Sequence, residues 1–176
     1  MDRISLFSAS LLETKVRPSR SPLLWLLVTY ALLRILFYQW PQIKAAFIYP
    51  TGLLVNLMGF AGEYAFDEWS YRFQTVRFTL GELCSGTTFF CLVMAFLVYQ
   101  WRSQRVSPIW FVVAYPLTIV ANAIRVGSSM ILYLLLDSMQ LSYLNEPFHL
   151  ACGVVTFLTA LLALAYLIET GRRRHG

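Results

Sequence analysis

The chain has 176 residues, of which 58% are hydrophobic and 13% are charged, and its mean hydropathy is +0.60. A helical membrane span needs roughly 20 mostly apolar residues, so this composition indicates a membrane protein with little chain left for a separate soluble domain. The net charge of +5 comes largely from basic residues beside the apolar segments, so it does not require a nucleic-acid partner.

The chain begins with a polar, basic leader over residues 1–22, and the first apolar span follows at 23–38. No small-x-small cleavage site follows this span, so the sequence indicates an uncleaved anchor rather than a signal peptide. The next apolar segment, 46–62, is interrupted by Pro50 and three glycines. The sequence leaves open whether this segment crosses the membrane, re-enters it or lies on its surface.

Residues 63–82 form the one substantial polar and aromatic stretch, and the FQTVRFTL portion alternates as a half-buried strand does. We expect this segment to lie outside the bilayer core. Three further spans are expected, at 83–101, 109–138 and 148–168. The span at 109–138 contains Pro116 and Gly127, which are expected to break the helix.

The pattern predicts an all-α polytopic membrane protein with a small bundle of about 4–6 transmembrane helices and a short extracytoplasmic strand-like segment. Residues 23–168 would form a single membrane-embedded domain, followed by a basic cytoplasmic tail at 169–176. The last span is expected to begin in LNEPFHLACG, with Asn145 as the N-cap and Pro147 in the first turn.

Short basic segments favour the cytoplasmic side of a membrane, and nine lysines and arginines flank the expected spans. They predict a multi-pass protein of the cytoplasmic (inner) membrane with both termini in the cytoplasm. Six of the nine acidic residues then fall on the outer side. This orientation requires that residues 46–62 do not cross completely. The nine basic residues are Arg3, Lys15, Arg17, Arg20, Arg102, Arg105, Arg172, Arg173 and Arg174.

Three reactive side chains are expected at the extracytoplasmic rim. Cys84 opens one span and His149 opens the last span, while Arg125 lies 17 residues past Pro108, a rise of roughly 25 Å along a helix. A helix N-terminus favours a thiolate, and a neutral imidazole accepts the thiol proton. An arginine at bilayer depth needs an anionic or polar partner, and a developing oxyanion is one such partner.

Each of these residues also has an ordinary role. A cysteine in a span is commonly a small packing residue, and we assign Cys91 and Cys152 to that class. A histidine at a membrane interface commonly caps a helix, and an arginine near the end of a span reaches to the headgroups. The interpretation as a reactive site depends on the three residue types meeting at one depth.

The segments ELCSGTTFF at 82–90 and NAIR at 122–125, together with the isolated His149, resemble the Cys, Arg, His pattern of the exosortase and archaeosortase family. The resemblance covers about residues 50–168, and the short chain is most similar to the compact, K-type exosortases. Members of this family are multi-spanning membrane transpeptidases. They process proteins with a C-terminal sorting signal of the PEP-CTERM type, which combines a short motif, a hydrophobic helix and a basic tail.

The resemblance implies thiol acyl transfer at the outer face of the helix bundle, without a cofactor or metal. The family's nucleophile falls on Cys84, which would attack a peptide carbonyl of a membrane-anchored client and form a thioester. The family's arginine falls on Arg125, which would stabilise the oxyanion, and its histidine falls on His149, which would relay the proton. Whether an amine, a hydroxyl or water accepts the acyl group stays open. Neighbouring residues that would support these three are Glu82, Ser85, Asn122 and Glu146.

The aromatic stretch before the cysteine has two interpretations. An alternating strand could bind an extended substrate by pairing with its backbone, and the aromatic residues would then contact the substrate. The same residues would equally suit an aromatic belt at the level of the lipid headgroups. The residues concerned are Trp69, Tyr71, Phe73 and Phe78.

Two rival functions remain open from the sequence. A noncatalytic assembly or transport subunit would use Arg125 to pair with an intramembrane acid of a partner protein. An intramembrane metalloprotein would use Cys84, Cys91, His149 and Cys152 as ligands, although neither HExxH nor CxxC is present.

Overall fold

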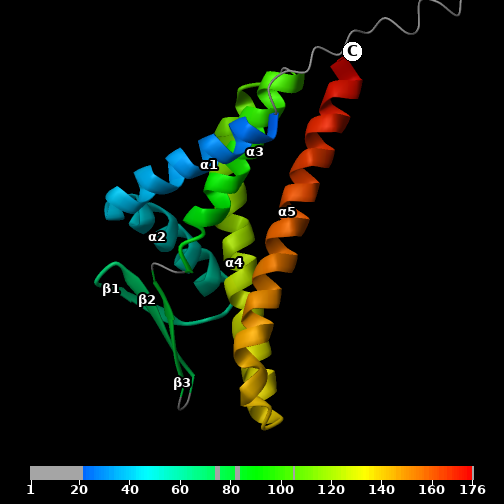
Figure 1. The fold of residues 1–176 in the computed structure, drawn as a ribbon. Coiled ribbons are helices and arrows are strands. Elements are labelled where there is room, and N and C mark those ends of the chain that lie inside the picture. Colours follow the sequence, from blue (N-terminus) through cyan, green and yellow to red (C-terminus); the bar gives the residue numbers. More distant parts are fainter. Residues whose placement is uncertain (1–21, 74–75, 82–83, 105, 176) are drawn as a thin grey trace, which may run out of the picture.

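The computed structural model describes residues 22–73, 76–81, 84–104 and 106–175. Most of the expected leader, together with Glu82 and Arg105, lies outside these ranges. The described chain is mostly helical, as predicted, and carries one small sheet (Figure 1). The elements in chain order are α1 (Pro22–Gln39), α2 (Pro41–Leu57), β1 (Gly62–Ala65), β2 (Glu68–Phe73), β3 (Val76–Leu80), α3 (Thr87–Gln104), α4 (Ile109–Ser138), the 3₁₀ turn η2 (Ser142–Leu144) and α5 (Asn145–His175).

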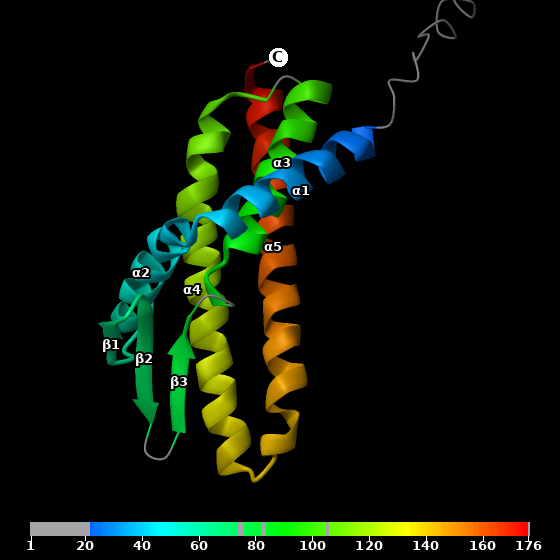
Figure 2. The ribbon, with the colours of Figure 1, turned by 60° about the vertical axis from the view of Figure 1, so that its left-hand side comes forward.

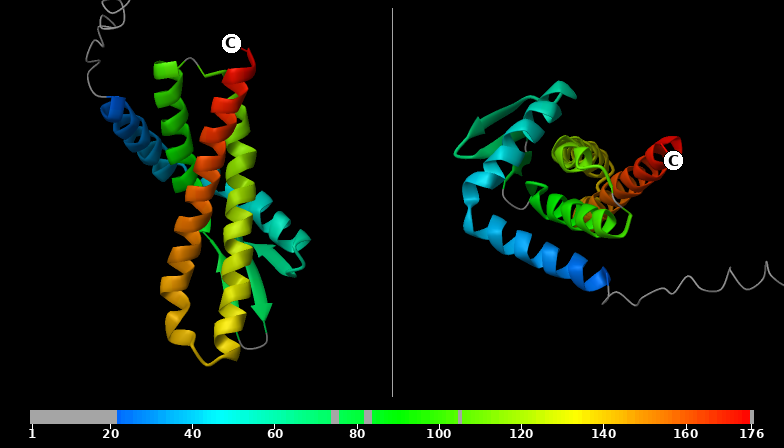
Figure 3. Two further views of the ribbon diagram at one scale, coloured as in Figure 1. Left: turned by 90° about the vertical axis from the view of Figure 1, so that its right-hand side faces the viewer. Right: turned by 90° about the horizontal axis from the view of Figure 1, so that it is seen from above.

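The longest helices, α4 and α5, run antiparallel and are joined through η2 (Figures 1 and 2). The helix α3 packs against α1 and α4, and α2 packs against α4 and the sheet. The beginning of α1, the α3–α4 connection and the C-terminus share one end of the molecule (Figure 1). Seen from above, the sheet and α5 lie on different sides of α4 (Figure 3). The helix α4 is therefore the central element of the fold.

Fewer helices than expected are long and apolar enough to cross a membrane. Within the described ranges two qualify, Ile109–Ser138 and Asn145–Gly171, and α1 with α2 would add a third if the bent pair counts as one span. The prediction of about 4–6 spans is therefore wrong. The expected span at 83–101 corresponds to α3, which begins four residues later, at Thr87, and ends three residues later in the polar sequence YQWRSQ.

Most of the segment 46–62, which the sequence left undecided, belongs to α2, the second helix of a bent pair. The axes of α1 and α2 meet at 91°, and the bend falls at Trp40, whose φ of −120° and ψ of 85° are not helical. The following Pro41 stands in the first turn of α2, where its fixed φ suits a helix start. The helix continues past Pro50 to Leu57. The pair has the geometry of a broken span or a re-entrant loop.

The predicted strand is confirmed for its second part, Val76–Leu80, in a three-stranded antiparallel sheet of order β1-β2-β3, whereas Phe73 at its start ends β2. Leu80 is fully buried while Arg77 and Thr79 are exposed, as the alternating sequence requires. The inner face of the sheet packs on α2 and α4, and the phenol of Tyr71 donates a hydrogen bond to the carbonyl of Gly52 (3.1 Å). Burial raises the pKa of Tyr71 to about 12, so this donor keeps its proton near neutral pH.

The helix α4 is continuous, so the expected breaks at Pro116 and Gly127 are wrong. Gly127 instead provides space, since a methyl group there would lie 3.0 Å from Cε of Met58. In the 18-residue apolar stretch of α4, 56% is buried inside the protein, whereas in the corresponding stretch of α5 only 11% is buried. The outer surface of α5 is therefore apolar and exposed, as expected of a helix that faces lipid.

We expect Gly52→Ala to destabilise the packing of the sheet on α2. A methyl group at Gly52 would overlap the indole ring of Trp69, and overpacking of this kind costs about 1–3 kcal/mol. The measurement is the thermal unfolding midpoint of the purified protein in detergent, followed by circular dichroism. Gly171→Ala is the control, because no atom lies within 4 Å of a methyl group there. Equal midpoints for the two variants would contradict this packing.

Candidate functional site

Cys84 lies in the tight turn that connects β3 to α3. Its backbone N–H donates to the carbonyl of Gly81 (3.0 Å), and Gly86 has φ of +79°, a conformation that favours glycine. The first residue of α3 is Thr87. The prediction that the cysteine begins the helix is therefore wrong by three residues, because the turn must close before the helix can start.

Asn122 of α4 holds this turn in place. The side chain is fully buried, and Nδ2 donates to the carbonyl oxygen of Cys84 (2.7 Å) and, at 3.5 Å, to Oγ1 of Thr51. A methyl group at Gly86 would lie 3.0 Å from Cγ of Asn122, so the turn rests directly on the amide. The predicted supporting residue is thus in contact with the backbone of the candidate nucleophile.

Ser85 closes the start of α3. Its Oγ lies 3.0 Å from Oγ1 of Thr87 and accepts a hydrogen bond from the backbone N–H of Thr87 (3.4 Å). Both side chains are buried. Ser85 therefore contributes to the geometry of the turn through contacts within the turn itself.

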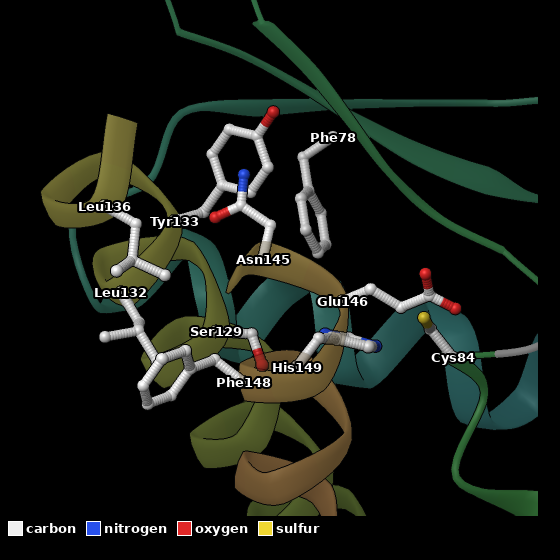
Figure 4. A pocket seen from close by; sticks show the side chains of 10 residues that line it. All are labelled: Phe78, Cys84, Ser129, Leu132, Tyr133, Leu136, Asn145, Glu146, Phe148 and His149. Atoms are coloured by element: carbon white, nitrogen blue, oxygen red, sulfur yellow. The ribbon is translucent and has the colours of Figure 1, made fainter. Parts of the chain in front are cut away.

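Cys84 and His149 line the same cavity, which has a volume of about 250 Å³ (Figure 4). The walls come from β3, the turn after it, the second half of α4 and the first turns of α5. The imidazole of His149 lies beside the ring of Phe78, with 6.3 Å between the ring centroids. In Figure 4 the side chains of His149 and Glu146 point toward the sulfur. Two of the three predicted catalytic residues are therefore brought to one site.

Arg125 lies one turn before the cavity residue Ser129 on α4 and does not line the cavity. Its side chain is 8% exposed, and its guanidinium lies over the ring of Phe157, 5.4 Å from the centroid. The side chain of Arg125 passes Gly153 of α5, where a methyl group would lie 3.7 Å from Cδ of Arg125. The positive charge acts electrostatically on His149. Among the described residues, Nε of Arg125 finds no hydrogen-bond partner.

One face of α4 connects these observations. Asn122 binds the turn that carries the thiol, Arg125 acts on the imidazole, and Ser129 lines the cavity. Residues three or four apart share a face of a helix, so one rigid element fixes the relative positions of all three. The thiol and the imidazole at one cavity suit nucleophilic attack and proton transfer in an acyl transfer, while the guanidinium adds a positive charge outside the cavity lining.

The predicted substrate-contacting aromatics occupy different places. Trp69 and Tyr71 are buried in the core between the sheet and α2, where they pack the sheet onto the helix. Phe78 lines the cavity. Phe73 belongs to β2, but its side chain lies outside the described part of the structure. Only Phe78 is therefore placed where it can touch a molecule bound beside Cys84.

Several residues of the cavity were not predicted from the sequence. Ser129, Leu132 and Leu136 follow Arg125 at helical spacing on α4, so continuing the face that begins at Asn122 would have found them. Asn145 was predicted to cap α5. The helix does begin there, but Oδ1 of Asn145 is buried without a hydrogen bond among the described residues, and it lines the cavity instead.

Within the described residues, no group of three or more histidine, cysteine, aspartate or glutamate side chains could hold a metal ion. Cys91 is fully buried on α3, and Cys152 is half-buried on α5. No protein-family model matches the chain, and comparisons with curated proteins and with solved structures find no match either. The function is therefore inferred from the residues and their geometry.

We expect Asn122→Asp to loosen the turn around Cys84. Aspartate has the same shape but cannot donate to the carbonyl oxygen, and leaving such a buried group unpaired costs about 1–3 kcal/mol. The labelling rate of Cys84 by a maleimide should rise in a Cys91→Ala, Cys152→Ala background. Thr51→Val is the control, because it removes only the 3.5 Å contact with Asn122 and should leave the rate unchanged. Equal rates in both variants would show that Asn122 does not hold the turn.

Proposed function

We propose that the protein is a membrane cysteine transpeptidase or protease that cleaves the C-terminal sorting signal of membrane-anchored client proteins. The observation that carries this proposal is that Cys84 and His149, from separate segments of the chain, line one cavity beside the buried Arg125. The resemblance of the three motifs to the exosortase and archaeosortase family supports the choice of client, a protein that ends in a short motif, a hydrophobic helix and a basic tail.

The proposed reaction begins when the thiol of Cys84 gives its proton to His149 and the sulfur attacks the scissile carbonyl. The carbonyl oxygen becomes an oxyanion, which the positive charge of Arg125 stabilises. When the adduct collapses, the C–N bond breaks and His149 returns the proton to the leaving amine. The product is a thioester on Cys84. An amine, a hydroxyl group or water then attacks the thioester and releases the client.

Asn122 and Glu146 position the reactive groups of Cys84 and His149. Asn122 holds the carbonyl of Cys84, so the sulfur keeps one position relative to α4. Glu146 is exposed at the cavity and stands three residues before His149 on α5, which places the two side chains on one helix face. We assign Glu146 to the orientation of the imidazole.

The arrangement of the fold supports a site on the outer side of a cytoplasmic membrane, with both termini inside. Arg102 in the last turn of α3, the α3–α4 connection and the C-terminus share one end of the molecule (Figure 1), where basic residues favour the cytoplasm. The cavity lies toward the other end, near the α4–α5 connection. The apolar outer surface of α5 offers the hydrophobic helix of a client a place in the lipid beside the site.

Trapping of the thioester tests the proposal. The protein is coexpressed with a reporter that ends in a short motif, a hydrophobic helix and a basic tail, and a hydroxylamine-sensitive adduct is sought by gel and mass spectrometry. We expect the adduct to be absent in Cys84→Ala and to form at least about 100-fold more slowly in His149→Ala, since general acid–base catalysis contributes about 10²–10⁴. Cys152→Ala, one turn beyond His149, should retain it. An adduct that persists without Cys84 would exclude this function.

A noncatalytic assembly subunit is the second candidate, because Nε of the buried Arg125 finds no hydrogen-bond partner among the described residues and an acid from a partner protein would satisfy it. This function predicts that Cys84→Ser keeps the biological activity while Arg125→Ala loses it. The transpeptidase predicts that both variants lose it. A complementation assay with the two variants separates the candidates.

A further inference from the structure

The sheet has a free edge beside the candidate active site. β3 is the terminal strand of the order β1-β2-β3, and no other strand of the described chain pairs with it. In Figures 1 and 2, β3 lies between β2 and the α4–α5 pair. The same strand supplies Phe78 to the cavity and leads within four residues from Leu80 to Cys84. An edge strand with unpaired backbone groups is a template for another extended chain.

The register shows which groups are free. Phe73 pairs with Val76 across a connection of two residues, and in such hairpins the closing pair exchanges both hydrogen bonds. Alternation then places Phe78 and Leu80 in bonded pairs with β2. Arg77 and Thr79 consequently direct their N–H and C=O groups toward the free edge.

The cavity next to this edge contains buried polar atoms that lack partners within the described chain. Ser129 is 4% exposed, and its Oγ makes no hydrogen bond. Oδ1 of Asn145 is also buried without a partner. Both residues line the cavity, together with apolar side chains such as Phe78 and Leu136. A buried polar atom of this kind costs about 1–3 kcal/mol, and a ligand with alternating donors and acceptors would remove that cost.

We propose that an extended segment of the substrate binds as a fourth strand on β3, with its scissile carbonyl at Cys84. A strand in this position would lie about 4.8 Å from β3 and would pair with the N–H and C=O groups of Arg77 and Thr79. Its alternate side chains would point, like that of Phe78, into the cavity. Ser129 and Asn145 would bind its polar groups. This inference rests on the proposed function and names the form in which the substrate is bound.

The opposite edge of the sheet does not offer the same site. β1 has four residues and leads away from the cavity, and its Gly62 already exchanges hydrogen bonds with the side chain of Asn56 (3.1 and 3.3 Å). The edge at β3 adjoins both the thiol and the unpaired polar atoms. The free backbone groups and the cavity together therefore favour β3 as the edge that binds peptide.

The test uses disulfide exchange at Cys84, which requires no catalysis. The full-length Cys91→Ala, Cys152→Ala protein in detergent is incubated with the disulfide of an acetylated hexapeptide of alternating valine and threonine that ends in cysteamine. The thiolate of Cys84 displaces one thiol and forms a mixed disulfide with the other. The concentration of 2-mercaptoethanol that reverses half of the adduct measures how strongly the peptide is held. A peptide with N-methyl groups on alternate amides is the ligand control.

We expect Thr79→Pro to lower this concentration by about 3- to 10-fold, because it removes one backbone donor from the free edge. Thr79→Val keeps the donor and should match the parent protein. Ser129→Ala should weaken retention about threefold without lowering the thermal midpoint, since its hydroxyl bonds to nothing among the described residues. Circular dichroism checks that each variant is folded.

The outcomes are separable from those of the proposed function. Equal retention in Thr79→Pro and Thr79→Val, or equal retention of the N-methylated peptide, would overturn strand pairing even if Cys84 forms a thioester with the reporter. Retention that depends on Thr79 would support strand pairing even if no thioester forms. In that case only the proposed transpeptidase function would be rejected.

Discussion

The contact between the amide of Asn122 and the carbonyl oxygen of Cys84 determines the geometry of the whole site. It joins the middle of α4 to the turn that connects the sheet with α3, and the Asn122 side chain that makes it is fully buried. Breaking this hydrogen bond is expensive because the buried amide would be left unpaired. The glycine at position 86 lets the turn approach the amide, and its positive φ brings the chain back into a helix immediately afterwards.

The helix α4 carries that constraint to the rest of the site. Its helical spacing places Arg125 one turn after Asn122 and Ser129 one turn further. The antiparallel α5 packs along α4 and carries His149. The side chain of Arg125 extends along α5 past Gly153 to Phe157. An arginine over an aromatic ring is partly compensated for its burial by the cation–π interaction. The charge therefore lies beside Phe157, two turns past His149 on α5, and influences the imidazole electrostatically from there.

Much of this arrangement follows from local sequence signals. Alternation predicted β3, and the Asn-Glu-Pro segment predicted the start of α5, because both signals act over a few residues. The order of apolar segments did not predict the number of spans, since Trp40 and Pro41 bend α1 against α2, and α3 starts late and includes the polar sequence YQWRSQ. The burial of Trp69 and Tyr71 could have been predicted, because they share the parity of one face of β2. The cavity required the tertiary placement of α4, α5 and the sheet.

Among the described residues, buried polar atoms without hydrogen-bond partners are more numerous around the cavity than on the sheet side, where Nε1 of Trp69 is one. On the sheet side, Tyr71 binds the carbonyl of Gly52, and Asn56 binds both backbone groups of Gly62. Around the cavity, Ser129, Asn145 and Nε of Arg125 are buried without partners among the described residues. Folded proteins retain such groups where the loss of stability is offset by a role in binding or chemistry. Those around the cavity lie on α4 and at the start of α5, where the substrate that the proposed function requires would supply hydrogen-bond partners.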